Sequence, residues 1–155
     1  MEKIVESIEY NTKIVKVTLH NVLDRYGVAA EIFGALGQHG LNIELISTHS
    51  VGHKRTDISF AVIESDLGEV LRLLETIKDK FGCKKITTDK DLALITLYGT
   101  KLSAAPGFAG KIFAILAERA INIEMISASL SVLSVVVKKG KVVEAVEAIK
   151  TQFSI

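Results

Sequence analysis

The sequence predicts an α+β fold made of two ferredoxin-like β-α-β-β-α-β units, each an antiparallel sheet with helices on one face. Three observations predict it: an internal repeat, the same order of strand-like and helix-like segments in both copies, and an unused strand-like segment at the N-terminus. The repeat has the greatest weight, because a duplicated segment is expected to fold the same way twice.

The repeat extends over 21 positions without a gap. Residues 27–47 and 107–127 share ten identical residues. The most similar part is LNIELIS in the first copy and INIEMIS in the second, and each Asn, Asn42 or Asn122, lies 15 positions after a glycine. The equal spacing predicts two units of the same design, and two copies are too few for a solenoid.

Each copy begins with a predicted strand and continues with a predicted helix. IVKVTL at 14–19 alternates apolar and polar residues, and LALITLY at 92–98 is apolar almost throughout. Such runs are typical of strands. After the glycine of each copy, apolar residues recur every three or four positions, which is typical of one helix face. We expect these helices to end near Gly40 and Ala120.

The second half of each copy predicts a hairpin and another helix. In the first copy a polar loop, HSVGHKRT, leads into DISFAVI at 57–63, and in the second copy the chain turns near 129–131 into VLSVVV. The helices that follow carry apolar residues at helical spacing up to Phe81 and Phe153. DLGE at 66–69 has the spacing of a capping box.

Each unit then needs one more strand. CKKITTD at 83–89 supplies it for the first unit, whereas too few residues follow Phe153 to supply it for the second. We infer that residues 4–10 cross over to complete the second sheet. The first unit therefore covers residues 14–89, and the second covers 92–155 together with the strand 3–10.

The composition excludes several classes of partner. The 19 basic and 18 acidic side chains leave a net charge of +1, so no nucleic-acid or membrane-surface partner is expected. No run of about 18 apolar residues indicates a membrane span. The single cysteine, Cys83, cannot form an internal disulfide and is expected to be a small core residue, so we expect a cytoplasmic protein.

No motif of catalysis is present, and we expect no catalytic residue, cofactor or metal. His20, His39 and Arg25 are expected to be isolated. An alternative is that His49, His53 and Asp57 hold a metal or serve a small ferredoxin-like enzyme. Their spacing is generic and the second copy has no equivalent, so a solvated, mobile loop is the preferred interpretation.

The repeats themselves indicate a polar backbone site. A glycine loop that enters a helix leaves unpaired N–H groups, which suit a small carboxylate at Gly27 and at Gly107. The amides of Asn42 and Asn122 both donate and accept, which suits a ligand with an acid and an amine. The alternative is structural: the glycines serve only their turns, and each Asn caps the preceding helix in the left-handed conformation.

These segments also resemble a known family. GVAAEIFGALGQHGLNIELIS with TDISFAV, PGFAGKIFAILAERAINIEMISASLSVLSVVV, and the opening VESIEYNTKIVKVTL are similar to the tandem ACT domains of the regulatory region of aspartokinase. The similarity covers nearly the whole chain. It implies a crossing N-terminal strand and threonine, lysine or both bound between ACT units, inhibiting a separate kinase domain.

The resemblance implies two sets of ligand-binding residues. One comprises Asp24, Gly27, Val28 and Ala29 of the first loop with Asn122 and Ile123. The other comprises Ser103, Pro106, Gly107, Phe108 and Ala109 with Asn42 and Ile43. This chain departs from the family at Tyr26, where a Pro usually precedes the glycine, and at Thr48, where the family often has a Gln that contacts threonine.

We therefore expect a non-catalytic regulatory module. Its expected partners are an amino-acid effector, either threonine or lysine, and an aspartokinase catalytic domain or α subunit, and its ACT units are expected to form a homodimer. Any aspartate kinase activity would reside in a kinase domain that this chain lacks. The alternative is a free-standing amino-acid sensor that regulates a different protein.

Overall fold

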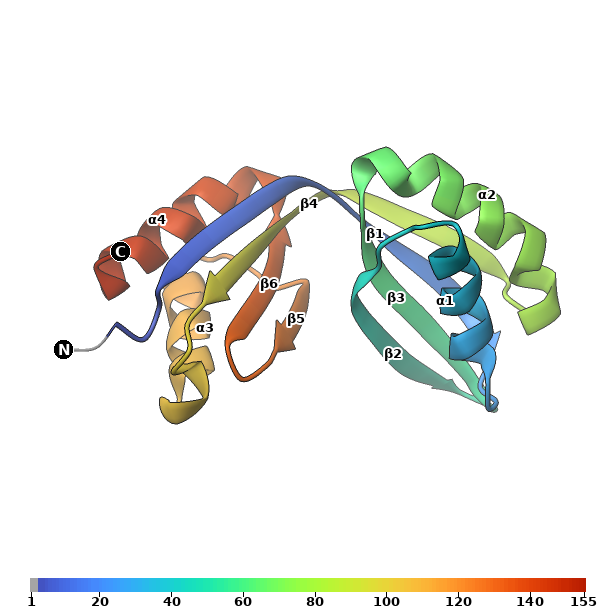
Figure 1. The fold of residues 1–155 in the computed structure, drawn as a ribbon, viewed down its shortest axis with the longest axis horizontal. Coiled ribbons are helices and arrows are strands. Elements are labelled where there is room, and N and C mark those ends of the chain that lie inside the picture. The colour runs from blue at the N-terminus through green and yellow to red at the C-terminus, as the bar shows by residue number, and fades with distance from the viewer. Residues whose placement is uncertain (1–2) are drawn as a thin grey trace. The chain divides into compact units, whose positions relative to one another are not determined.

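The computed structural model describes residues 3–155 as two compact units (Figure 1). The first unit comprises Lys13–Lys90, and the second comprises the residues up to Thr12 together with Asp91–Ile155. Each unit has two α-helices and an antiparallel sheet, as the sequence predicts. Strands β1 and β4 contribute one part of their length to each unit.

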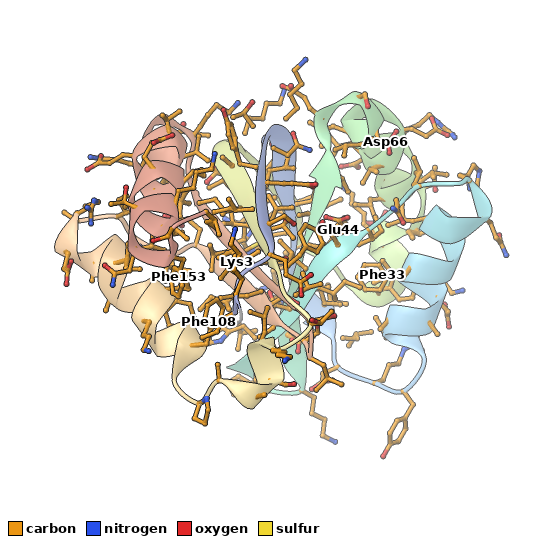
Figure 2. The ribbon with its side chains drawn as sticks, turned by 60° about the vertical axis from the view of Figure 1, so that its left-hand side comes forward. Lys3, Phe33, Glu44, Asp66, Phe108 and Phe153 are labelled. Carbon is orange, nitrogen blue, oxygen red and sulfur yellow. The ribbon has the colours of Figure 1, made fainter. Side chains whose placement is uncertain are left out.

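The first unit contains β1, β2, β3 and β4 in the order β2-β3-β1-β4, so β2 is an edge strand. Its elements are β1 (Ser7–Leu23), α1 (Val28–Gln38), β2 (Glu44–Gly52), β3 (Arg55–Ile63), α2 (Leu67–Ile77) and β4 (Lys85–Tyr98). Apolar residues on one face of the sheet pack against both helices, and Phe33 of α1 stacks edge-to-face on Phe60 at 5.4 Å (Figure 2).

The second unit repeats this arrangement in the order β1-β4-β6-β5, with β5 at the edge. Its further elements are α3 (Phe108–Glu118), β5 (Met125–Ala128), β6 (Val132–Lys138) and α4 (Val142–Phe153). Phe108 at the start of α3 stacks on Phe153 at the end of α4, with ring centroids 5.5 Å apart (Figure 2). This contact fixes the start of α3 on the core.

The crossing strand that the sequence predicts is present. The N–H of Glu6 donates to the carbonyl of Tyr98 at 2.8 Å, and Val5 lies in the core of the second unit. The sequence predicts two separate segments at 4–10 and 14–19, but β1 is one strand from Ser7 to Leu23. The polar residues between them interrupt the apolar alternation, yet no Gly or Pro interrupts the backbone, so the strand continues.

The same correction applies to β4. Segments 83–89 and 92–98 are predicted as separate strands, and the structure joins them from Lys85 to Tyr98. The first part of β4 thereby serves the first unit and the second part serves the second unit. Strands β1 and β4 thus run through both units as uninterrupted backbone, and each is at the edge of one unit and internal in the other.

The predicted capping box before α2 does not form. Asp66 already has helical backbone angles (φ −91°, ψ −10°), because a 3-10 turn at Glu64–Asp66 precedes the helix, and its side chain makes no capping hydrogen bond. An N-cap residue normally has an extended backbone. At the other end, α2 stops at Ile77 and a 3-10 turn carries the chain to Phe81.

The polar hairpin of the first unit is a tight turn. His53 and Lys54 have φ values of 54° and 57°, and Gly52 pairs with Arg55 across the turn. Two central residues with positive φ are the signature of a type I′ turn, whose twist matches that of the flanking strands. His49 therefore lies in β2 and not in a mobile loop, which corrects the prediction.

Candidate functional site

The two glycines that start the repeats adopt the left-handed conformation. Gly27 has φ 86° and Gly107 has φ 78°, and each immediately precedes a helix. A β-carbon built on either glycine would meet nothing within 4 Å. Glycine is therefore required for its backbone conformation, while the space in front of it is open.

Each glycine leads into a helix whose first turn leaves two backbone N–H groups unpaired among the described residues. Glu31 donates to the carbonyl of Gly27 at 2.9 Å, and Lys111 donates to that of Gly107 at 3.0 Å. Within residues 3–155, the N–H groups of the two residues before Glu31 have no backbone acceptor, and the same holds before Lys111. Unpaired N–H groups and the helix dipole together attract an anion such as a carboxylate.

The first loop is held by charged side chains. The guanidinium of Arg25 lies 3.8 Å from the carboxylate of Glu31 and 5.8 Å from the centroid of the Phe81 ring. The prediction that Arg25 is isolated is therefore wrong. Lys80 forms an ion pair of 2.8 Å with Glu31, and this hydrogen bond lowers the pKa of the Glu31 carboxyl. Asp24 is exposed, and its backbone N–H donates to the carbonyl of Lys54 at 2.9 Å.

Tyr26 is the feature of this loop that sequence reasoning missed. Its side chain is fully exposed, with a relative accessibility of 103%. Large aromatic side chains are rarely left entirely in water. An aromatic residue directly before the left-handed Gly27, where the second copy has Pro106, is the sequence signal that could have indicated it.

The second loop is anchored differently. A 3-10 turn at Leu102–Ala104 buries Leu102, and the N–H of Ser103 donates to the carbonyl of Leu130 at 3.2 Å. Pro106 and Gly107 are exposed, while Phe108 is buried against Phe153. Ala29 and Ala109 occupy the same place in the first turns of α1 and α3. The two loops share backbone geometry but not side-chain chemistry.

The two asparagines do not cap the helices. The left-handed residues after α1 and α3 are Gly40 (φ 70°) and Ala120 (φ 53°), which lie two positions before Asn42 and Asn122. Both Asn side chains are exposed, and within residues 3–155 neither amide has a hydrogen-bond partner. The capping interpretation is therefore wrong, and the amides are free to meet a ligand.

The residues after the asparagines lead into the edge strands. Ile43 and Ile123 are half-buried, and Thr48 is exposed on β2. Leu45, in the repeated motif, has φ 55°, and the β2–β3 register shifts between Glu44 and Ser47. A positive φ at leucine is uncommon, and its repeat counterpart Met125 does not have one. The sequence carries no signal for this irregularity.

One unit does not bring its own loop and its own Asn together. Gly27 precedes α1 and Asn42 follows it, and this helix has 11 residues. At 1.5 Å per residue the two ends are about 16 Å apart. An amino acid cannot touch both ends of one helix. The loop and the Asn of one unit therefore do not form a single site within that unit.

The alternative metal site is not formed. Among residues 3–155, no group of three His, Cys, Asp or Glu side chains is placed to hold a metal. Asp57 instead accepts a hydrogen bond of 2.8 Å from the N–H of Asn21 and lies 3.4 Å from His20 Nδ1. His20 is thus not isolated, and His39 Nδ1 likewise lies 3.0 Å from the carbonyl of Ala35.

Cys83 lies in the core of the first unit. Its Sγ donates to the carbonyl of Lys85 at 3.3 Å, and burial raises the pKa of its thiol. Because the thiolate is the reactive form, this environment is the opposite of that of a nucleophilic cysteine. In the described part of the chain, no helix is both long and apolar enough to span a membrane.

Comparison with known proteins agrees with this architecture. Models of the ACT domain match residues 17–81 and 95–153. Aspartokinase 2 of Bacillus subtilis (strain 168) is 31% identical over 152 residues, which are 98% of this chain but 37% of that protein. The chain therefore spans little more than a third of the length of this relative.

Two solved structures match over nearly their full length. The ligand-free regulatory subunit of aspartate kinase from Thermus thermophilus has 26% identity and a TM-score of 0.90, and the match covers 97% of this chain and 99% of that one. A structure of aspartokinase α and β subunits has 28% identity, a TM-score of 0.88 and the same coverage. The chain belongs to the ACT domain family, with two ACT domains in tandem as in the regulatory region of aspartokinases.

Proposed function

We propose that this chain is a non-catalytic regulatory module that binds threonine or lysine between ACT units and thereby controls an aspartokinase. One observation carries the proposal. A left-handed glycine precedes each of the helices α1 and α3, and an Asn whose amide has no partner within residues 3–155 follows each helix. Both copies have this pair of features at the same spacing. Each part alone could also be structural, and it is their equal spacing in both copies that favours a ligand site.

The chemistry of the two features suits an α-amino acid. The N–H groups at the start of α1, beside Ala29, would hold its carboxylate, and Asp24 would meet its ammonium group. The amide of Asn122 would complete this site from the second repeat. By the pseudo-symmetry, Ser103 and Phe108–Ala109 would form the other site with Asn42 and Ile43.

The length of α1 supports placing the effector between units. One unit presents its loop and its Asn at opposite ends of an 11-residue helix, so each effector would bridge two units. An effector held in this way stabilises the paired state. It shifts the equilibrium of the assembly only by its difference in affinity for the paired and unpaired states.

The edge strands favour a homodimer as that assembly. Ile46 on β2 and Ile126 on β5 occupy the same place in the repeat and are 52% and 51% exposed. Apolar side chains on an unpaired strand edge favour pairing with another strand. We therefore propose that ACT units of two chains pair, and that an aspartokinase catalytic domain or α subunit, in the cytoplasm, receives the signal.

The test is a titration of the purified chain with single amino acids by isothermal calorimetry. Threonine or lysine should bind and raise the melting temperature, while alanine, which has the same backbone groups, should bind at least tenfold more weakly. If threonine, lysine and methionine all fail to bind at millimolar concentration, the effector proposal is wrong. Copurification with an aspartokinase then tests the proposed partner separately.

A further inference from the structure

The sheet of the first unit carries a polar cavity on the face opposite its helices. Its volume is about 370 Å³, and all nine lining side chains are polar. They come from four strands: Lys16, Thr18 and His20 of β1, His49 of β2, Asp57 and Ser59 of β3, and Thr87, Thr88 and Asp89 of β4. The alternating residues Val15, Val17 and Leu19 of β1 point the other way, into the core.

Hydrogen bonds order the floor of this cavity. Thr18 Oγ1 and Ser59 Oγ share a bond of 2.9 Å, and His20 Nε2 and Thr87 Oγ1 share one of 2.7 Å. Asp57 is held by the N–H of Asn21 at 2.8 Å and by His20 Nδ1 at 3.4 Å. The side chains therefore have fixed positions before any ligand arrives, which lowers the entropic cost of binding.

The charged group of the cavity that has no partner among the described residues is the Lys16 ammonium group. Lys16 is half-buried, and its ammonium group has no ion-pair or hydrogen-bond partner within residues 3–155. The imidazole of His49 has none either. The charge of Asp57 is committed to His20 and Asn21, and Asp89 has a separate interaction of its own. The Lys16 ammonium is left to meet an incoming group, together with the one hydroxyl hydrogen that the Thr18–Ser59 pair does not use.

We propose that this cavity binds a small oxyanion, a phosphate or a carboxylate group, through the Lys16 ammonium and the hydroxyl groups of Thr18, Ser59 and Thr87. Ammonium and hydroxyl donors that line one cavity suit the oxygen atoms of an anion. This site is independent of the proposed amino-acid site. It uses strand side chains on the open face, whereas the amino-acid site uses helix N-termini and Asn amides.

The site belongs to the first unit alone. In the strand pairing of the second unit, Thr96 pairs with Ser134 as Thr18 pairs with Ser59 in the first, and the buried Leu94 stands two residues before Thr96, where Lys16 stands before Thr18. The second unit therefore keeps a Thr–Ser pair but lacks the cation. A duplicated effector site would be present twice, so this cavity gives the chain a separate input.

The test is a two-dimensional amide NMR titration of the full chain, at constant ionic strength, with inorganic phosphate in one arm and malonate in the other. Saturable shifts should centre on Thr18, His20 and Ser59 in at least one arm, and the tighter arm identifies the oxyanion. Lys16→Gln should weaken that binding at least tenfold. Lys84→Gln, which removes an exposed charge of the same unit outside the cavity, should change it less than twofold.

A second variant separates binding from folding. Thr18→Val keeps the size of the side chain and the strand propensity but removes one hydroxyl, and it should weaken the binding severalfold with an unchanged spectrum elsewhere. The proposal is overturned if neither anion gives saturable shifts at these residues. It is equally overturned if the affinity survives Lys16→Gln, or if the shifts centre on Ala29 and Ala30 at the helix N-terminus instead.

Discussion

The carbonyl oxygen of Ile4 lies where a β-carbon of residue 99 would stand, so Gly99 is the only residue type that fits there. A β-carbon at that position would also press on the side chain of Leu102 at 3.0 Å. Gly99 donates its own N–H to the carbonyl of Ser131 at 2.9 Å, which fixes it in place. The close approach joins the N-terminal segment to the end of β4.

Gly99→Ala should therefore loosen the N-terminal strand of the second unit. The overlap is with backbone, which cannot turn aside as a side chain can, and we expect a loss of about 1–3 kcal/mol in the free energy of unfolding. Urea unfolding and amide hydrogen exchange of residues 4–10 measure it. The matched control is Gly34→Ala. Gly34 lies in α1, and a β-carbon built on it would meet nothing within 4 Å.

The control should be neutral or should stabilise the chain by up to about 1 kcal/mol, because alanine is the better helix former. Equal stability of Gly99→Ala and wild type, with unchanged exchange in residues 4–10, would show that this segment does not depend on the close approach.

The same segment should respond to acid through Glu6. The hydroxyl and the N–H of Thr100 donate to Glu6 Oε1 at 2.6 and 3.0 Å, and these bonds lower the pKa of Glu6 below its ordinary value of 4.5. Because the pKa of Glu6 is lowered in the folded state, the ionised Glu6 stabilises the fold at pH values above its ordinary pKa. This stabilisation is lost as the pH falls through the lowered value.

In the wild type, protection of residues 4–10 from hydrogen exchange should fall as the pH is lowered into the acid range, and Glu6→Gln should lose part of this fall. At neutral pH, these residues should be better protected in the wild type than in Glu6→Gln. Glu9→Gln removes the same charge three residues further along the segment without removing the Thr100 contact, and it should keep the wild-type profile. Identical acid profiles for wild type and Glu6→Gln would refute the role of the Thr100 contact.

Cys83 should be unreactive in the folded chain. Burial raises the pKa of its thiol, so the thiolate is scarce at neutral pH, and the sulfur lies in the core. We expect modification by a thiol reagent to be at least a hundredfold slower than for a free thiol, and to become fast in denaturing urea. A fast reaction without denaturant would show that the first unit opens locally at this strand.

The fold is largely predictable from this sequence, because duplication shows each pattern twice. The helices at Val28–Gln38 and Phe108–Glu118 follow directly from apolar spacing after the left-handed glycines. The continuity of β1 could not be predicted, since polar residues hide a strand whose backbone hydrogen bonds do not depend on side-chain polarity. At Asp66 the sequence predicts a feature that the structure lacks. The capping-box spacing is present, but the 3-10 turn at Glu64–Asp66 leads directly into the helix and Asp66 forms no cap.

The candidate site is predictable only in part. The equal Gly-to-Asn spacing predicts its backbone elements, and the ligand site that they would form stays a prediction. The exposure of Tyr26 and the positive φ of Leu45 depend on tertiary structure, and no periodicity encodes them. Likewise, the contact of His20 with Asp57 joins strands that are distant in sequence.

Gly27 should tolerate asparagine better than alanine. Its φ of 86° is costly for alanine, by about 1 kcal/mol, whereas asparagine enters the left-handed region more readily. Urea unfolding should rank the variants as wild type, Gly27→Asn, Gly27→Ala in decreasing stability. If alanine were as stable as glycine, the left-handed loop would not be the conformation in solution, and the proposed carboxylate site would lose its basis.

The most direct measurement of the central proposal is calorimetry of threonine and lysine with the wild type, Asn42→Ala and Asn122→Ala. Both side chains are exposed and unpartnered, so the variants should fold normally. We predict that at least one of them weakens binding of the effector at least tenfold, because a hydrogen bond to a charged group of the ligand contributes about 1.5–3 kcal/mol. Unchanged affinity in both variants, or no binding to the wild type, would contradict the account.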